Sequence, residues 1–154
     1  MRLSKIIKKT AINLEMGAAT KDEALCSLVE ILCSAYRISD IGTVLKAIKA
    51  REDKQSTGVG MGLAVPHAKT SVADKLYVAF GRSKDGVDFD SIDGEKAHLF
   101  FILISPRDVS GPHIKALAGI SRLVKHEEFR KSLIECENVK TFINLVKRAE
   151  GKYL

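Results

Sequence analysis

The most informative stretch of this chain reads Thr57-Gly58-Val59-Gly60-Met61-Gly62-Leu63-Ala64-Val65-Pro66-His67. Its glycines occupy alternate positions, which leaves the backbone free to adopt positive φ and lets another group approach closely. The apolar triplet that follows them predicts a short buried strand. Pro66 then fixes its own φ and keeps the residue before it extended. The pattern therefore predicts that the ring of His67 is held in one place.

A predicted helix over residues 41–52 leads into this stretch. Ser39 or Asp40 caps its start, and apolar residues recur along it at helical spacing. Arg51 falls at its C-terminal end, where the helix dipole favours a cation. This local reason is sufficient by itself to explain an arginine here, so a functional role for Arg51 needs further evidence.

The region before that helix is predicted to hold a basic leader, a strand and another helix. Residues 1–10 are rich in lysine and are expected to be loose or helical, and residues 11–14 form a plausible short strand. Thr20 and Glu23 have the spacing of a capping box, in which each side chain accepts from the other residue's backbone. This box predicts a helix that runs to about residue 36.

Strands are predicted to dominate the chain after His67. Residues 76–80 form a dense apolar run, residues 86–90 alternate like a strand, and residues 92–94 resemble a turn. Residues 97–104 are almost all apolar, as in a central strand that is covered on both faces.

The last third of the chain is predicted to be helical. Ser110 is expected to cap a helix with Pro112 in its first turn, residues 129–136 form a second helix, and Asn138 caps the last one. The order of elements predicts an α/β fold in which a mixed β-sheet is sandwiched by helices. We expect residues 1–154 to form a single compact domain.

Composition and length limit the classes of protein. The chain is 45% hydrophobic and 29% charged, as is ordinary for a globular protein. Its longest apolar runs, 76–80 and 99–104, are far too short to span a bilayer, and the basic N-terminus precedes no continuous apolar segment. Three cysteines without CxxC spacing indicate neither a disulfide framework nor a zinc site. We therefore expect a cytoplasmic protein without direct membrane insertion.

The formal net charge of +6 leaves two interpretations of the surface. One is an acidic partner such as nucleic acid, and the other is a solvated basic surface. The lysines and arginines are spread along the whole chain, aromatic residues are few, and no nucleic-acid-binding signature is present. We therefore expect no nucleic-acid partner.

The glycine loop fails the spacing tests for a nucleotide site. A P-loop needs Lys-Ser or Lys-Thr after a correctly placed glycine, and the Rossmann fingerprint GxGxxG leads from a strand into a helix. This GxGxG follows a predicted helix and precedes a strand.

The sequence also lacks the spacings of a histidine metal site and of a serine nucleophile. The four histidines form no HxH or HxxxH pair, and no GxSxG elbow is present. The sequence therefore predicts no metal site.

With nucleotide and metal sites disfavoured, the histidines themselves are the candidates for chemistry. A neutral imidazole can accept a phosphoryl group without first losing a proton to a base, and this transfer needs mainly positioning and nearby donors. His113 lies in the first turn of its predicted helix, where free N–H groups and the dipole favour an anion, and Arg51 could add a fixed positive charge. From these residues alone, a structural role is an equal alternative for His67, and it is the favoured one for His113, His98 and His126.

These residues resemble a known family. Arg51-Glu52 with the stretch from Ser56 to His67 is similar to the active-site signature of the enzyme IIA domain of the bacterial phosphoenolpyruvate-dependent phosphotransferase system, of the fructose, mannitol and nitrogen-regulatory type. Further similar segments follow in the family's order, at residues 87–90, 92–94, 98–104, 112–118 and 121–123. The resemblance covers about residues 8–150.

The resemblance implies a role for each matching residue. His67 would accept a phosphoryl group from the histidine-containing phosphocarrier protein and pass it to a cysteine of an enzyme IIB partner. His113 would contact the phosphoryl group, Arg51 would be the active-site arginine, and Thr57 and Gly58 would form the neighbouring loop. The family uses no metal and no organic cofactor.

Two kinds of function fit this resemblance. One is a phosphotransferase in sugar uptake, and the other is a regulatory protein of the nitrogen-related branch, in which phosphorylation of His67 switches binding to target proteins. No enzyme IIB or membrane segment is attached within the chain, which favours regulation slightly and implies a free-standing IIA protein. A third interpretation is a degenerate homologue that binds partners without transfer, but the intact Arg51, His67 and His113 argue against it.

Overall fold

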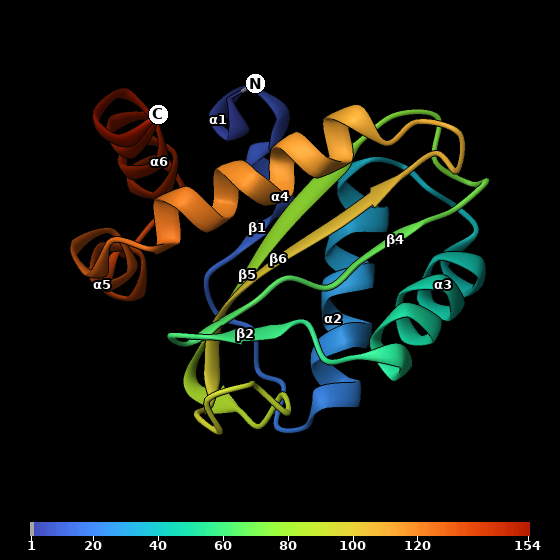
Figure 1. Cartoon of the computed structure of the whole chain (residues 1–154), viewed down its shortest axis with the longest axis horizontal. Helices are drawn as coiled ribbons and strands as arrows, with labels where there is room; N and C mark the ends of the chain where they lie inside the picture. Colours follow the sequence, from blue (N-terminus) through green and yellow to red (C-terminus); the bar gives the residue numbers. More distant parts are fainter. Residues whose placement is uncertain (1) are drawn as a thin grey trace.

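The computed structural model describes residues 2–154 and shows a mixed β-sheet with helices on both faces (Figure 1). Its helices are α1 (Leu3–Ile6), the 3-10 turn η1 (Lys9–Ala11), α2 (Lys21–Ala35), α3 (Ile41–Lys54), α4 (Gly111–Val124), α5 (Glu127–Glu135) and α6 (Val139–Tyr153). Its strands are β1 (Ile12–Asn13), β2 (Gly58–Gly60), β3 (Leu63–Ala64), β4 (His67–Lys69), β5 (Tyr77–Val87) and β6 (Ala97–Ser105). The predicted fold class is confirmed.

The strand β6 lies at the centre of the sheet. In the order β1-β5-β6-β3-β2 it is antiparallel to β5 and parallel to β3. The short strand β4 follows β3 along the same edge of β6 and pairs His67 with Leu103. Pro66 lies between β3 and β4, and its carbonyl accepts a hydrogen bond of 3.0 Å from Leu103 N. The central strand therefore fixes the place of His67 in the sheet.

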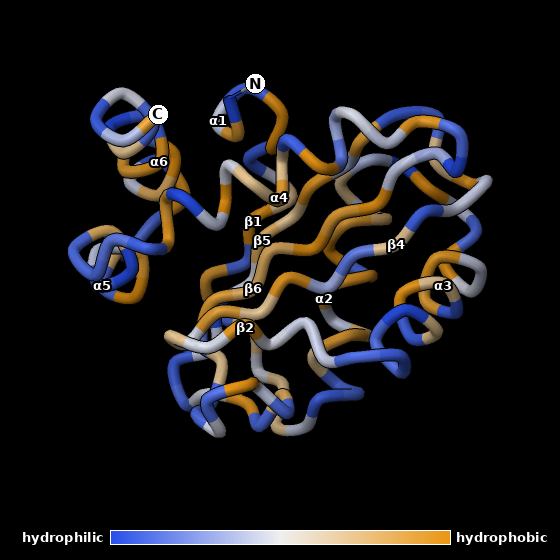
Figure 2. The backbone as a smooth tube through the Cα atoms, viewed as in Figure 1, coloured by the Kyte–Doolittle hydropathy of each residue, from blue (hydrophilic) through white to orange (hydrophobic). Residues whose placement is uncertain are grey.

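Helices cover both faces of the sheet. In Figure 1, α2 lies behind the strands and α4 crosses in front of them, with α5 and α6 beyond one edge. Hydrophobic residues concentrate in β5 and β6 (Figure 2), and all but one side chain of β6 is buried. The ring of Phe80 packs against Phe101 and Phe142, with centroids 4.9 and 4.5 Å away. Each such fully buried ring contributes about 2 kcal/mol through the hydrophobic effect.

Three predicted helix caps are present. The side chains of Thr20, Asp40 and Asn138 each accept a hydrogen bond from the backbone N–H three residues later, which begins α2, α3 and α6. The capping box at α2 differs in one detail, because the carboxylate of Glu23 accepts from Ala19 N at 2.9 Å instead of from the N–H of Thr20. Local capping chemistry thus placed these helix starts correctly.

Ser110 is the N-cap residue of α4, as predicted, but it does not cap the helix through its side chain. Its backbone is helical, with φ −107° and ψ −27°, and its side chain makes no capping hydrogen bond. The hydroxyl is instead bonded to Nζ of Lys69, on the neighbouring strand β4. A contact between distant parts of the chain therefore replaced the local one.

The predicted strand at residues 86–90 is correct only for its first two residues, which belong to β5. β5 ends at Val87, and the next residues form a loop in which Phe89 is fully buried while Asp88 and Asp90 are exposed. Polar and apolar residues alternate here because Phe89 anchors the loop to the core, while the residues on either side of it face solvent. Within the predicted leader, Leu3 and Ile7 are buried, and Met1 lies outside the described residues.

A search of residues 2–154 for membrane-spanning helices gives none, since no helix there combines enough length with enough apolar character.

Candidate active site: a histidine pair beside an arginine and a glycine loop

His67 is the first residue of β4 and is half-buried. Its Nδ1 lies 2.8 Å from the carbonyl oxygen of Val65. Because a carbonyl only accepts, Nδ1 must carry the hydrogen, and in the neutral ring the lone pair then lies on Nε2. The backbone around Pro66 therefore fixes both the direction and the tautomer of this ring.

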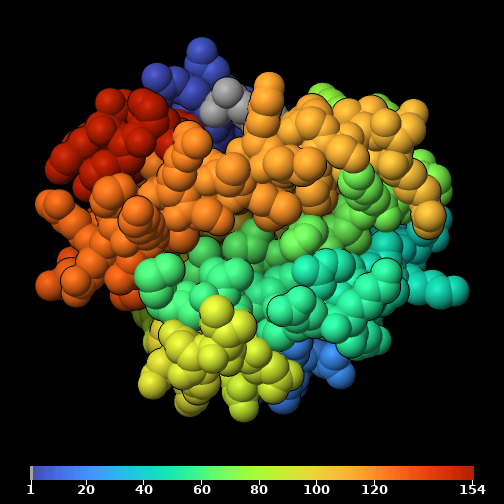
Figure 3. All heavy atoms as spheres, viewed as in Figure 1, coloured from blue at the N-terminus to red at the C-terminus, as the bar shows by residue number. Residues whose placement is uncertain are grey.

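His113 faces His67 from the first turn of α4. The two ring centroids are 5.3 Å apart and the ring planes meet at 61°. His113 is buried, and its Nδ1 lies 2.7 Å from Oγ of Ser105, the last residue of β6. In the space-filling view, α4 borders the green segment that contains β2 to β4 (Figure 3), so the two histidines come from elements that meet on one face.

Both histidines are held neutral at pH 7. Burial lowers the pKa of His67, and the nearby charge of Arg51 lowers it further, whereas the bond to Val65 and the charge of Glu52 act in the opposite direction. Burial, with the charges of His67 and Lys69, lowers the pKa of His113 to about 4. A neutral ring has the free lone pair that a nucleophile needs.

Arg51 lies in the last turn of α3, as predicted, and donates from Nη1 to the carbonyl oxygen of Gln55 at 2.8 Å. Its guanidinium is close enough to act on the pKa of His67. The positive charge of Arg51 therefore acts on His67, and its bond to Gln55 also satisfies a carbonyl at the end of the helix.

The glycine loop, residues 57–62, leads into the strand that precedes His67. Gly60 and Gly62 have φ of +91° and +76°, values that favour glycine. At Gly58 a Cβ would lie 2.5 Å from Oγ of Ser91, so only glycine fits there. Thr57 is buried next to Gly58. Both predicted loop residues are therefore positioned by tight packing.

Four polar residues around this site received no predicted role from the sequence, although Glu52 stands in the segment that resembles the active-site signature. They are Lys21, Glu52, Lys69 and Ser105. Glu52 is buried directly after Arg51, Lys69 lies two residues after His67 on the same strand, and Ser105 is the polar end of an apolar strand. The strand periodicity of two could have indicated Lys69, because alternate residues of a strand share a side.

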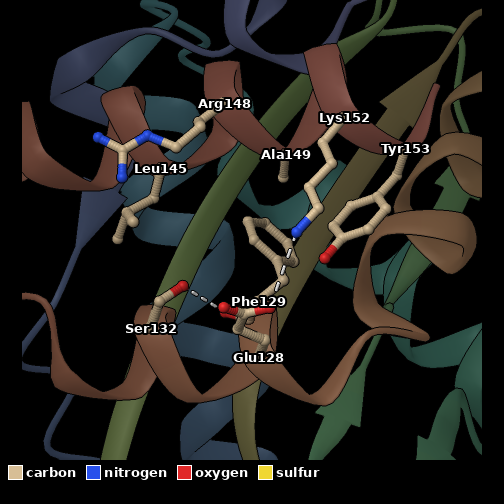
Figure 4. A pocket seen from close by; sticks show the side chains of 8 residues that line it. All are labelled: Glu128, Phe129, Ser132, Leu145, Arg148, Ala149, Lys152 and Tyr153. Atoms are coloured by element: carbon tan, nitrogen blue, oxygen red, sulfur yellow. Dashed lines mark hydrogen bonds and ion pairs between the residues drawn. The ribbon is translucent and has the colours of Figure 1, made fainter.

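The other two histidines have structural contacts. His98 donates from Nδ1 to the carbonyl oxygen of Ser83 at 3.0 Å, and the ring of His126 stacks on Tyr153 with centroids 3.5 Å apart. A hollow of about 180 Å³ between α5 and α6 includes Phe129, Tyr153 and the Lys152–Glu128 ion pair (Figure 4). None of the predicted site residues lines it.

Comparison with known proteins decides the family. Residues 5–149 match the family model described as "Phosphoenolpyruvate-dependent sugar phosphotransferase system, EIIA 2". The chain belongs to this EIIA type 2 family. The EIIA component for fructose of Haloferax volcanii is 38% identical to this EIIA chain over 139 residues, which are 90% of each protein.

Two further relatives differ in length and in name. The fructose-specific EIIABC component of Bacillus subtilis is 37% identical over 146 residues, and the match spans 95% of the present EIIA chain but 23% of that protein. The crystal structure of the nitrogen regulatory protein IIA-Ntr from Neisseria meningitidis has a TM-score of 0.87 at 26% identity, covering 94% of this chain and 98% of that one.

One structural neighbour is a complex. It contains enzyme IIA for mannitol and phosphorylated enzyme IIB for mannitol from Escherichia coli. Its TM-score is 0.77 at 23% identity, with 92% of this EIIA chain and 97% of that chain covered, so the likeness concerns the fold.

Proposed function

We propose that this EIIA chain is a cytoplasmic phosphocarrier. It accepts a phosphoryl group on His67 from the histidine-containing phosphocarrier protein and passes it to a cysteine of an enzyme IIB partner. The observation that supports this most is the hydrogen bond from Nδ1 of His67 to Val65, because it leaves Nε2 as the nucleophile. Membership of the EIIA family supports the choice of partners, as does the complex of the mannitol enzyme IIA with phosphorylated enzyme IIB.

The first transfer forms one N–P bond and breaks another. Nε2 of His67 attacks phosphorus, the N–P bond of the donor's phosphohistidine breaks, and the donor's histidine leaves with the electron pair of that bond. Nδ1 keeps its hydrogen, and the Val65 carbonyl stabilises the positive charge that the ring gains. In the second transfer a thiolate of enzyme IIB attacks phosphorus, and Nε2 recovers its lone pair.

The neighbouring residues would hold the phosphoryl group. Ser105 occupies Nδ1 of His113, so Nε2 of His113 is the nitrogen left to contact the group. Arg51 adds positive charge, and the N-terminus of α4 attracts an anion through the helix dipole. Thr57 and Gly58 would form the packed loop that supports the segment before His67.

Phosphorylation with purified components tests the proposal. Incubation with phosphoenolpyruvate, enzyme I and the phosphocarrier protein is expected to give an acid-labile phosphate on the wild-type chain. His67→Ala should abolish the label, whereas His126→Ala, a matched change at a histidine with structural contacts only, should retain it. Full labelling of His67→Ala would overturn the assignment.

His113 is expected to act on the rate of transfer. His113→Ala should slow phosphorylation of His67 by about 100-fold, the cost of misplacing or losing one contact at a reacting group. Urea unfolding measured on the same variant separates this effect from stability. If His113→Ala lowers the free energy of unfolding enough to account for the slower transfer, the role of His113 is structural.

A regulatory function is the second candidate. It is supported by the likeness to the nitrogen regulatory protein IIA-Ntr, whose fold matches almost the whole chain with a TM-score of 0.87. In this case the phosphorylation state of His67 would control binding to target proteins without sugar transport. Pull-down with both forms distinguishes the two: targets retained by one form support regulation, and sugar-dependent dephosphorylation with membranes supports transport.

A further inference from the structure

A buried carboxylate, that of Glu52, contacts the first residue of the glycine loop. Glu52 is 5% exposed, and it follows Arg51 in the last turn of α3. Its Oε1 accepts a hydrogen bond of 2.8 Å from the backbone N–H of Thr57, and its Oε2 accepts one of 2.6 Å from the Thr57 hydroxyl. This two-point contact fixes both the backbone and the side chain of Thr57.

A cation from another element completes the environment of Glu52. Nζ of Lys21, in the first turn of α2, lies 3.1 Å from Oε1 of Glu52 and 3.5 Å from Oδ2 of Asp90. The same ammonium lies 4.8 Å from the centre of the Phe89 ring. A buried carboxylate is tolerated when it is paired and hydrogen-bonded, and Glu52 meets both conditions.

The contact at Thr57 continues to the ring of His67. The carbonyl of Thr57 accepts a hydrogen bond of 3.0 Å from the N–H of Val65, and the carbonyl of Val65 accepts from Nδ1 of His67 at 2.8 Å. Three successive hydrogen bonds therefore connect Glu52 to the imidazole through only two intervening residues. Pro66 restricts the backbone between Val65 and His67, so a shift of Val65 must move the carbonyl that holds the ring.

We propose that Glu52, paired with Lys21, is a positioning residue for phosphoryl transfer. It holds Thr57, and through Thr57 and Val65 it holds the Nδ1–H tautomer and the direction of the His67 ring. The role in transfer rests on the proposed function, whereas the control of the ring does not. Phosphoryl transfer depends mainly on positioning, so a small displacement of Nε2 reduces its rate.

The test compares four variants with the wild-type chain. Glu52→Gln removes the charge that pairs with Lys21, and Thr57→Val removes the hydroxyl that donates to Oε2. Thr57→Ser keeps both donors of Thr57 and is the rescue. Asp53→Asn is the matched control, because Asp53 is the exposed neighbour of Glu52 on the same helix.

Two readouts are required. Nitrogen-15 spectra of the imidazoles report the tautomer of His67 directly, and single-turnover kinetics report the rate of phosphorylation. We expect Glu52→Gln and Thr57→Val to populate the Nε2–H tautomer and to slow transfer by about 10-fold or more. Asp53→Asn should retain the wild-type tautomer and remain within about 2-fold of its rate. Thr57→Ser should restore the Nδ1–H tautomer and much of the rate that Thr57→Val loses.

The outcomes separate this inference from the proposed function. A wild-type tautomer and rate in both Glu52→Gln and Thr57→Val would overturn the positioning role alone. If the wild-type chain accepts no phosphate, the proposed function fails, and the imidazole spectra still test the control of the ring. Should Glu52→Gln not fold, Thr57→Val and its serine rescue decide the question.

Discussion

His67 and His113 occupy different environments although their rings lie 5.3 Å apart. His67 is half-buried with a backbone partner at Nδ1, and His113 is buried with a hydroxyl partner at Nδ1. Burial lowers the pKa of both rings. It lowers that of His113 to about 4, with further contributions from the charge of Lys69 and, once it is protonated, from that of His67. The two rings therefore differ in their exposure and in the group that holds Nδ1.

This difference predicts a dependence of stability on pH. The pKa of His113 is about 4 in the folded chain and near its ordinary value of 6.5 when unfolded. Between these values the unfolded chain binds the proton and the folded one does not, so stability falls as the pH falls. Acidification from pH 7 to 4.5 should lower the free energy of unfolding through this group by about 2 to 3 kcal/mol.

The measurement is urea unfolding across that range for the wild type and His113→Gln. The variant lacks the titrating ring, so the difference in stability between the two proteins should shrink as the pH falls. Parallel pH curves for the two proteins would contradict the lowered pKa.

The element that shapes the site is the glycine loop with β2. Its hydrogen bonds run to the segment that follows β5: Ile92 N donates to the Gly58 carbonyl at 3.1 Å, and Asp93 accepts from Met61 N at 2.9 Å. The loop after β5 thus supports the loop before β3. Buried Phe89 anchors that support to the core.

A methyl group tests this packing. Gly58→Ala places Cβ 2.5 Å from Oγ and 2.9 Å from Cα of Ser91, so backbone must move. We expect a loss of about 2 kcal/mol in the free energy of unfolding, as for overpacking. Gly42→Ala in α3 is the control, because nothing lies within 4 Å of its Cβ, and it should be neutral or slightly stabilising. Equal stabilities of the two variants would refute the close contact.

At the scale of the whole molecule, a buried arginine connects segments that lie far apart in the sequence to the sheet. Arg82 of β5 is 3% exposed. It donates to the carbonyl of Leu14 at 3.0 Å and to that of Leu133, near the end of α5, at 2.9 Å. A cation at a helix C-terminus is favoured by the dipole, and here it also connects the segment after β1 with α5.

Arg82→Met is expected to destabilise the fold by about 3 kcal/mol, since it leaves several buried carbonyls without donors. The control is Lys84→Met on the same strand, where the side chain is exposed, and a change within about 0.5 kcal/mol is expected. Denaturant unfolding of both variants gives the comparison. A neutral Arg82→Met would show that this connection is dispensable.

Features that depend on neighbouring residues could be predicted from the sequence alone. The caps of α2, α3 and α6, the apolar strand β6 and the restricted segment at Pro66 all follow from interactions within a few positions. The motif around His67 and its resemblance to the EIIA family identified the candidate residues, because those residue types stand at fixed spacing. Local chemistry and local pattern are sufficient for such features.

Contacts between distant groups required the folded chain. The pairing of β4 with β6 and the packing of α4 place His113 beside His67 and Ser105 on His113. The same packing brings the Ser110 hydroxyl to Nζ of Lys69 instead of to a backbone N–H of α4. The buried contacts of Glu52 likewise depend on how α2, α3 and the glycine loop come together. Periodicity and capping cannot specify these contacts, because they depend on strand register and helix packing across the whole fold.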